Sequence, residues 1–395
     1  MTANVGATVK VQDRAKTMKH RSGRVLIDAR LLAYRRGGIS RYIDGLTEWL
    51  PRVAPDLPFA RVVNRPIARS KSPDICVRTP PHFRFERVSL GVELSLRSPA
   101  LLHSTDFIAP ILPGVRHVVT VHDLAFLLYP ALLSKDALRY YGQIERSLRV
   151  ADRVIAVSAY TAGQLSEITN VANDKIVIVH NGADERRVSI DRAEASTILR
   201  RELGDETTSR ILENRPVILA VGTIEPRKRQ QLLLQAIERP PLCDAQTAPL
   251  LILVGQKGWA CDAIVADIEQ ASAAGRVIWL DDASDNTLAA LYCLATVLAL
   301  PSLDEGFGLP LLEAMAADLV VVAARRGALP EVAGDAAVLL DSDDPSAWAE
   351  ALHGIIVDCA RREALIALGR LRAAEYTWER TARRTADVYR EVLRQ

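Results

Sequence analysis

The chain of 395 residues contains no apolar run that approaches the roughly 18–20 residues needed to span a bilayer. Its first 20 residues also lack the apolar core of a secretion signal. The apolar fraction of 49% and the charged fraction of 25% are those of an ordinary globular protein. We therefore expect a protein of the cytoplasm, and the length of the chain favours two domains over one.

Cysteine is scarce and shows no pattern. The five cysteines are widely spaced, and none forms a C-x-x-C pair or a cluster with histidine. They are Cys76, Cys243, Cys261, Cys293 and Cys359. The sequence thus predicts free thiols in a reducing compartment, and it offers no zinc-type ligand set.

Aromatic residues make up 5% of the chain and are not interleaved with basic ones, so a nucleic-acid partner is disfavoured. The formal net charge of +2 conceals an asymmetry. Residues 1–180 contain 26 Lys+Arg against 15 Asp+Glu, a net charge of +11, whereas the remainder contains 24 against 33, a net charge of −9. A basic first half predicts attraction to an anionic surface, for which a membrane is the favoured candidate.

Strand and helix patterns alternate through most of the sequence. Residues 1–21 are polar and basic without periodicity, which predicts a disordered tail. Apolar segments typical of buried strands lie at 24–28, 101–103, 117–121, 153–158, 175–180, 216–222, 250–255, 277–280, 297–300, 320–323 and 336–340. Helical patterns separate many of them, which predicts parallel, doubly wound sheets. Residues 51–100 predict only short strands and loops, and residues 183–214 predict an irregular interdomain region.

Residues 301–316, Pro-Ser-Leu-Asp-Glu-Gly-Phe-Gly-Leu-Pro-Leu-Leu-Glu-Ala-Met-Ala, form the most informative stretch. A strand end, a glycine turn and a helix predict that Glu305 lies on the loop and Glu313 about two turns into the helix. The N–H groups of Gly306 and Gly308 at the helix start favour an anion or a sugar hydroxyl. Two carboxylates beside such a turn suit a polyhydroxylated ligand, although two ordinary surface glutamates are the alternative.

Two further turns carry features of a phosphate site. Residues 222–229, Gly-Thr-Ile-Glu-Pro-Arg-Lys-Arg, follow a predicted strand. Gly222 permits a close backbone approach, and Arg227 and Lys228 suit a diphosphate, with a solvated basic turn as the alternative. A double glycine at 37–38 lies between the first strand and a helix, which predicts either a phosphate cradle or a plain turn.

The pair Glu305 and Glu313, with seven residues between them, resembles the E-x7-E signature of the retaining glycosyltransferases of family four. The basic turn is similar to the diphosphate clamp of that family. The resemblance covers residues 24–395 and implies the α/β GT-B fold, in which two Rossmann-like domains with doubly wound parallel sheets face each other across a cleft. The predicted domains are residues 22–185 and 186–377, with a C-terminal helix, 378–395, that crosses back to the first domain.

The resemblance also implies roles for individual residues. His122, in Thr-Val-His-Asp-Leu, corresponds to a histidine near the donor sugar, and Glu305 would position that sugar or stabilise charge on it. Glu313 would accept hydrogen bonds from the ribose. The implied catalytic set is His122, Glu305, Arg227 and Lys228. The implied donor-binding set is Gly37, Gly38, Gly222, Thr223, Gly255, Leu280, Gly306, Phe307, Gly308, Leu309 and Glu313.

No metal and no cofactor are implied beside the nucleotide sugar, because the clamp is present and no D-x-D motif is evident at a strand end where a metal would be expected. The chain departs from the family where Gly327 replaces a serine before Ala-Leu-Pro-Glu331. It also departs at residues 316–320, after Glu-Ala-Met, and at residues 279–285, which leaves the nucleotide base open. The basic turn and residues 255–259 look most like bacterial polysaccharide and O-antigen mannosyltransferases, so GDP-mannose is the favoured donor.

The acceptor implied by this resemblance is a glycan, carried on a lipid, in the synthesis of lipopolysaccharide or exopolysaccharide. Residues 124–133 are strongly apolar and predict either a buried connection or a patch that touches lipid at the inner face of the membrane. The alternatives that stay open are a UDP- or dTDP-sugar donor, a catalytically silent nucleotide-sugar-binding partner, and a sugar-nucleotide epimerase.

Overall fold

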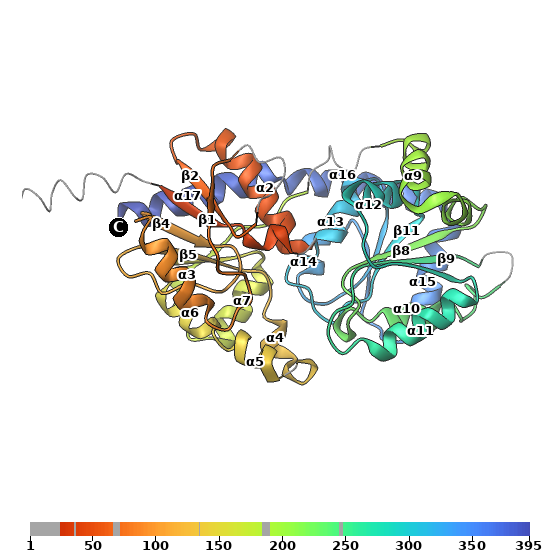
Figure 1. The fold of residues 1–395 in the computed structure, drawn as a ribbon. Coiled ribbons are helices and arrows are strands. Elements are labelled where there is room, and N and C mark those ends of the chain that lie inside the picture. Colours follow the sequence, from red (N-terminus) through yellow and green to blue (C-terminus); the bar gives the residue numbers. More distant parts are fainter. Residues whose placement is uncertain (1–23, 35–36, 66–71, 134, 184–189, 245–247) are drawn as a thin grey trace, which may run out of the picture.

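The computed structural model describes residues 24–34, 37–65, 72–133, 135–183, 190–244 and 248–395. These residues form two α/β domains, coloured red to yellow and green to blue in Figure 1. The predicted disordered tail, residues 1–21, lies outside the described residues, as does the predicted domain boundary at 185–186. Within the described ranges, no helix combines the length and the apolar character that crossing a bilayer requires.

The first domain is built on a seven-stranded sheet in the order β3-β2-β1-β4-β5-β6-β7, in which neighbouring strands run parallel. The strands are β1 (Val25–Asp28), β2 (Phe59–Val63), β3 (Asp74–Cys76), β4 (Leu101–Ser104), β5 (Arg116–Val121), β6 (Arg153–Ala156) and β7 (Ile176–Ile178). The helices are α2 (Gly38–Val53), α3 (Glu86–Ser95), α4 (Ala125–Leu128), α5 (Lys135–Tyr141), α6 (Ile144–Val150) and α7 (Ala159–Ile168), with 3-10 turns η1 (Arg30–Ala33), η2 (Pro130–Leu132) and η3 (Asn173–Lys175).

The second domain repeats this plan around a six-stranded parallel sheet in the order β10-β9-β8-β11-β12-β13. The strands are β8 (Val217–Val221), β9 (Leu250–Val254), β10 (Val277–Leu280), β11 (Val297–Leu300), β12 (Val321–Ala324) and β13 (Val338–Leu340). The helices are α9 (Arg192–Ile211), α10 (Gln230–Ala236), α11 (Asp262–Ala273), α12 (Asp285–Leu294), α13 (Leu309–Ala316), α14 (Leu329–Ala333), α15 (Pro345–Val357) and α16 (Cys359–Glu375), η4 (Pro226–Lys228) is a 3-10 turn, and the last helix, α17 (Trp378–Arg394), packs on the first domain.

Both sheets reverse their direction of winding once, between β1 and β4 and between β8 and β11. Their central strands are buried on both faces, which explains the short, continuous apolar runs in the sequence. In an open sheet of this kind, ligands bind beyond the carboxyl ends of the strands at such a switch point. The predicted fold class, two doubly wound parallel sheets, is confirmed.

Several local predictions were wrong. Residues 51–100 include helix α3, which the proline-rich surroundings obscured, and residues 183–214 include the long helix α9, which kinks at Gly204 where φ is +82°. Glu313 lies one turn into α13 instead of two, because the helix begins only at Leu309.

In the part of the chain that the structure describes, Ala183, at the end of the first domain, lies beside Tyr376 and Thr377, which lead into α17. The N–H of Ala183 donates to the carbonyl of Tyr376 at 3.0 Å, and Ala183 forms a parallel bridge with Thr377. Helix α17 then runs along the first domain and packs against α2 (Figure 1). Its Tyr389 hydroxyl lies 2.6 Å from Nδ1 of the buried His103 in β4, so the end of the chain completes the core of the first domain.

Candidate active site

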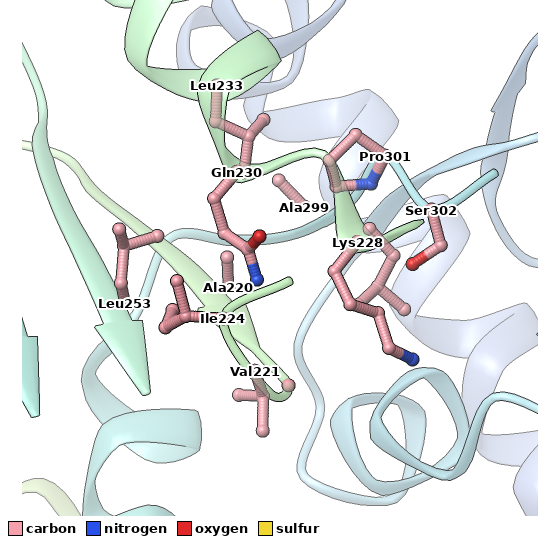
Figure 2. Close-up of a pocket in the computed structure, with 12 residues that line it drawn as sticks. Ala220, Val221, Ile224, Lys228, Gln230, Leu233, Leu253, Ala299, Pro301 and Ser302 are labelled. Carbon is pink, nitrogen blue, oxygen red and sulfur yellow. The ribbon is translucent and has the colours of Figure 1, made fainter. Parts of the chain in front are cut away.

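A pocket with about 280 Å³ of open space lies at the switch point of the second sheet. It is lined by residues at the ends of β8 and β11 and by Lys228 and Gln230 (Figure 2). In Figure 2 the side chain of Lys228 extends beside Ser302, and the amide of Gln230 reaches down toward the end of β8. The basic turn after β8 and the acidic turn after β11 therefore face a common space, because their strands are neighbours in the sheet.

The acidic and basic turns are joined by a compact ion pair. Nζ of Lys228 donates to both carboxylate oxygens of Glu305 at 2.7 Å. The hydroxyl of Ser302 donates to Oε1 of the same carboxylate at 2.7 Å. Arg227 reaches across the turn, where its Nη1 donates to the carbonyl of Asp304 at 2.7 Å and lies 3.9 Å from Oε2 of Glu305. An ammonium carries three donors, so one N–H of Lys228 stays available to a ligand.

Glu305 is ionised in this setting although it is only 8% exposed. Burial by itself raises the pKa of a carboxyl, but the charges of Lys228 and Arg227 and the hydrogen bonds from Lys228 and Ser302 bring the pKa of Glu305 below its ordinary value. Burial likewise opposes the charge of Arg227, and nearby carboxylates, Asp123 first among them, raise its pKa above the usual range. The site therefore holds fixed charges of both signs.

The acidic turn leaves no room for larger residues. A Cβ on Gly306 would lie 1.8 Å from the carbonyl oxygen of His122 in the first domain. Gly308 has a φ of +89°, and a Cβ there would lie 2.6 Å from Leu329. Gly327 has a φ of +61° and packs its backbone against that of Glu305, where a Cβ would lie 2.6 Å from the backbone N and O. This contact explains the departure at Gly327, because a serine would disturb the Glu305 loop.

The second glutamate of the signature has partners on both domains. Oε1 of Glu313 accepts from Nη1 of Arg41 in α2 at 2.6 Å, and Oε2 accepts from the hydroxyl of Tyr292 at 2.9 Å. Arg41 also donates to Asp285 at 3.2 Å. Through these two bonds Glu313 links the second domain to α2 of the first.

His122 stands at the end of β5, opposite the acidic turn. Its Nε2 lies 2.8 Å from the carbonyl oxygen of Thr105, which only accepts, so this nitrogen carries the proton. Burial lowers the pKa of His122 below its ordinary value, which favours the neutral ring. Nδ1 is then the unprotonated acceptor of the ring. The following residue, Asp123, lies 3.8 Å from Nη1 of Arg227.

The remaining predicted donor-binding residues lie around this centre at different depths. Gly37 and Gly38 are exposed at the start of α2, and a Cβ on Gly38 would lie 3.7 Å from Leu309 of α13 across the cleft. Gly255 packs against Gly222, and its N–H donates to the carbonyl of Leu280 at 2.9 Å. Thr223 and Phe307 also make contacts within the protein. The carbonyl of Thr223 accepts a hydrogen bond from Gln230 at 2.9 Å. The ring of Phe307 packs near that of Tyr376, with 5.9 Å between the ring centres.

The structure also places residues at the site that the sequence did not single out. The Asp304 carboxyl is fully buried, and its Oδ1 accepts from the hydroxyl of Tyr160 at 2.7 Å, across the domain interface. Burial and the nearby Asp123 raise the pKa of Asp304. Arg41 lies in the segment that contains the double glycine, but its partner is 272 residues away in sequence. No spacing rule predicts such a pair, because it arises from the docking of two domains.

Comparisons with known proteins agree with this geometry. A family model described as "Glycosyl transferases group 1" matches residues 215–358, and one described as "Glycosyltransferase Family 4" matches residues 36–187. The O-antigen chain mannosyltransferase B of Escherichia coli is 31% identical over 276 residues, which are 70% of either chain. The D-inositol 3-phosphate glycosyltransferase of Salinispora tropica is 33% identical over 297 residues, which are 71% of this chain and 60% of that one.

Two solved structures share the fold. The sucrose-phosphate synthase from Thermosynechococcus elongatus superposes with a TM-score of 0.74 at 21% identity, over 93% of this chain and 98% of that chain. Anabaena HepE in complex with UDP-glucose superposes with a TM-score of 0.73 at 18% identity, over 93% and 99% of the two chains.

Two doubly wound domains with a basic turn and an acidic turn at one switch point define a glycosyltransferase of the GT-B class. The chain belongs to glycosyltransferase family 4 and is a retaining enzyme. The resemblance drawn from the E-x7-E pair is thereby confirmed.

Proposed function

We propose that the enzyme transfers a hexose, with mannose from GDP-mannose as the first choice, to a hydroxyl of a lipid-linked glycan in the synthesis of a bacterial surface polysaccharide. The observation that carries the proposal is the buried pair of Lys228 and Glu305 beside the switch-point pocket. The mannosyltransferase from Escherichia coli supports the choice of sugar. The net charge of +11 in residues 1–180 supports work at the anionic inner face of a membrane.

The charges of the site match the charges that develop during transfer. When the bond between sugar and diphosphate breaks, negative charge grows on the diphosphate, and Arg227 together with the spare N–H of Lys228 stabilises it. The anomeric carbon of the sugar becomes electron-poor at the same time, and the negative charge of Glu305 stabilises the positive charge that develops there. Because these groups are already fixed by hydrogen bonds, they need little reorganisation as the reaction proceeds.

The remaining residues bind and orient the donor. Gly306 and Gly308 direct backbone N–H groups toward the phosphate and sugar, and Glu313 accepts from the ribose hydroxyls. The neutral His122 accepts a hydrogen bond from a sugar hydroxyl through Nδ1. The incoming hydroxyl attacks on the face from which the diphosphate leaves, and the leaving phosphate takes its proton, so the anomeric configuration is kept. No side chain has to serve as the base.

A panel of donors tests the proposal. GDP-mannose, UDP-glucose and dTDP-glucose are compared for thermal stabilisation of the protein, since a ligand that binds only the folded state raises its stability. GDP-mannose should give the largest shift, and transfer to mannosyl acceptors, with D-inositol 3-phosphate as a further acceptor, should give a product with the α configuration by NMR. If UDP-glucose or dTDP-glucose gives the largest thermal shift, then the donor carries that nucleotide and not GDP. Binding without transfer or hydrolysis favours a silent binding partner, and an altered free nucleotide sugar favours an epimerase.

A further inference from the structure

A second pocket opens between the two domains, next to the candidate active site. It offers about 290 Å³ of open space. The first domain contributes Ala125, Tyr129 and Leu133 from the apolar segment 124–133, and the second domain contributes Trp259 and the turn that carries Glu225, Pro226 and Arg227. The start of this segment, Leu124 to Phe126, is buried, whereas Leu128 is exposed, and Tyr129 and Leu133 are half-buried where they line the pocket.

The pocket is continuous with the reacting centre through one residue. Arg227 lines the pocket, and its Nη1 lies 3.9 Å from Oε2 of Glu305 and 3.8 Å from Oδ2 of Asp123. Only the guanidinium of Arg227 therefore separates a group in this pocket from the proposed position of the leaving diphosphate. Because both domains supply its walls, the pocket is complete only when they are apposed as they are here.

The walls combine an aromatic face with charged groups. Trp259 is 37% exposed, and its ring lies 5.5 Å from that of Tyr141 at an angle of 64°, which fixes its orientation. Among the five tryptophans, all of which the structure describes, it is the most exposed. Glu225 is 8% exposed and pairs with Arg227 at 2.9 Å. An apolar ring face next to a carboxylate and a guanidinium suits a pyranose, whose C–H face packs on an aromatic ring while its hydroxyls bond to charged groups.

We propose that this pocket binds the sugar ring of the acceptor, which packs against Trp259 and directs its reactive hydroxyl past Arg227 toward the donor. The inference rests on the proposed function. It specifies that the acceptor group bound at this pocket is a carbohydrate and not a lipid without sugar or a protein. A pyranose can use both parts of the wall, because its C–H face packs on Trp259 while its hydroxyls reach Glu225 and Arg227, whereas an alkyl chain would use only the apolar part.

The first test measures binding without a donor. Methyl α-mannopyranoside is titrated into the full-length protein while tryptophan emission is followed. We expect a saturable change in emission that is lost in Trp259→Phe and retained in Trp49→Phe, a matched change at a half-buried tryptophan of α2 that does not line the pocket. A change that persists in Trp259→Phe overturns the proposal, and so does a change produced by octyl glucoside or octanol but not by the methyl glycoside.

The second test separates acceptor binding from turnover. Trp259→Ala should raise the acceptor KM by roughly tenfold or more while kcat changes by less than about threefold, because the ring binds substrate and transition state alike. Trp259→Phe should recover most of the loss, and Phe85→Ala, which removes an exposed ring from the first domain, should change neither constant. An unchanged acceptor KM in Trp259→Ala overturns the proposal. If no nucleotide sugar binds or reacts, yet the methyl glycoside still acts through Trp259, then the proposed function fails and the pocket stands.

Discussion

At the scale of single residues, the site depends on a carboxylate that stays charged while it is almost out of contact with water. Glu305 achieves this because Lys228, Arg227 and Ser302 all lie within its reach. Desolvating an isolated carboxylate is costly, whereas a carboxylate that accepts several charge-assisted bonds is stable. The arrangement binds the acidic loop to the basic loop before any donor arrives.

The first prediction concerns the pH dependence of stability. The pKa of Glu305 lies below its ordinary value in the folded state, so the carboxylate adds stability above the unfolded pKa, and this contribution is lost as the pH falls through the folded pKa. Glu305→Gln should therefore lower the free energy of unfolding by about 3 kcal/mol at neutral pH and by less in acid, where the native carboxylate becomes protonated, as measured by urea denaturation. Glu379→Gln, which removes an exposed helical pair with Arg383, should cost little at either pH. An equal loss from Glu305→Gln at both pH values contradicts the prediction.

The second prediction concerns turnover. Lys228→Met keeps the apolar stem of the side chain but removes the charge that faces the leaving diphosphate. We expect the transfer rate to fall by about 100-fold to 1,000-fold, the loss typical of one preorganised donor to a developing anion. Circular dichroism should show an intact fold. Lys175→Met, in η3 of the first domain, is the matched control, and a rate in Lys228→Met within a few-fold of the native rate would remove this residue from the mechanism.

At the scale of elements, the turn between β11 and α13 is the part that touches both domains. The carbonyl of Gly306 accepts from the hydroxyls of Ser158 at 2.6 Å and Thr161 at 3.1 Å, both at the start of α7. The start of α7 also receives Glu331, whose carboxylate accepts from the N–H groups of Ala159 and Tyr160. The free N–H groups of a helix N-terminus favour such a negative charge. Two loops of the second domain are thus seated on one helix of the first.

The third prediction tests this seating. In Gly306→Ala the added Cβ would lie 1.8 Å from the carbonyl oxygen of His122, so the domains cannot close as they do in the native protein. We expect a larger radius of gyration in small-angle scattering and a transfer rate lower by about 100-fold, because a small misplacement of reacting groups is costly. Gly163→Ala, inside α7, adds its Cβ to open space and should change neither quantity. Unchanged scattering and turnover in Gly306→Ala would show that the apposed domains are not the active arrangement.

The sequence predicted elements wherever periodicity was strong and failed where structure depends on docking. Apart from β2 and β3, which lie within residues 51–100, the described strands were placed from their apolar runs, and the meeting of the loops around Lys228 and Glu305 was expected from the family resemblance. Helix α9 was missed because its apolar residues, among them Ala195 and Leu199, are few and its exposed face is highly charged. The pairing of Arg41 with Glu313 was not predictable, since neither partner carries a local signal of the other.

At the scale of the whole molecule, helix α17 makes the first domain depend on the end of the chain. Trp378, at its start, packs on Gly45 of α2 so closely that a Cβ on that glycine would lie 2.2 Å from the ring. Further along, Tyr389 bonds to His103, whose pKa burial and the nearby His122 lower to about 3. The first domain is therefore assembled from both ends of the sequence.

The fourth prediction follows from this dependence. Trp378→Ala removes a ring that is 7% exposed and should lower the free energy of unfolding by about 3–5 kcal/mol in chemical denaturation. The loss should affect the first domain, because the ring packs against α2. Leu371→Ala on the preceding helix removes a side chain that is 71% exposed and should stay within about 0.5 kcal/mol of the native protein. If the two variants lose equally little unfolding free energy, then α17 contributes little to the stability of the first domain.

The paired crossings of the chain near Ala183 and Thr377 also restrict how the cleft opens. Two domains joined by a single connecting segment can rotate about it. Two connecting segments held together by a hydrogen bond resist this rotation and allow mainly a hinge motion. The domains should therefore open by a hinge motion about the segments near Ala183 and Thr377. The pocket beside Lys228 and the pocket beside Trp259 would then widen at the same time, and the two products that we propose could leave together.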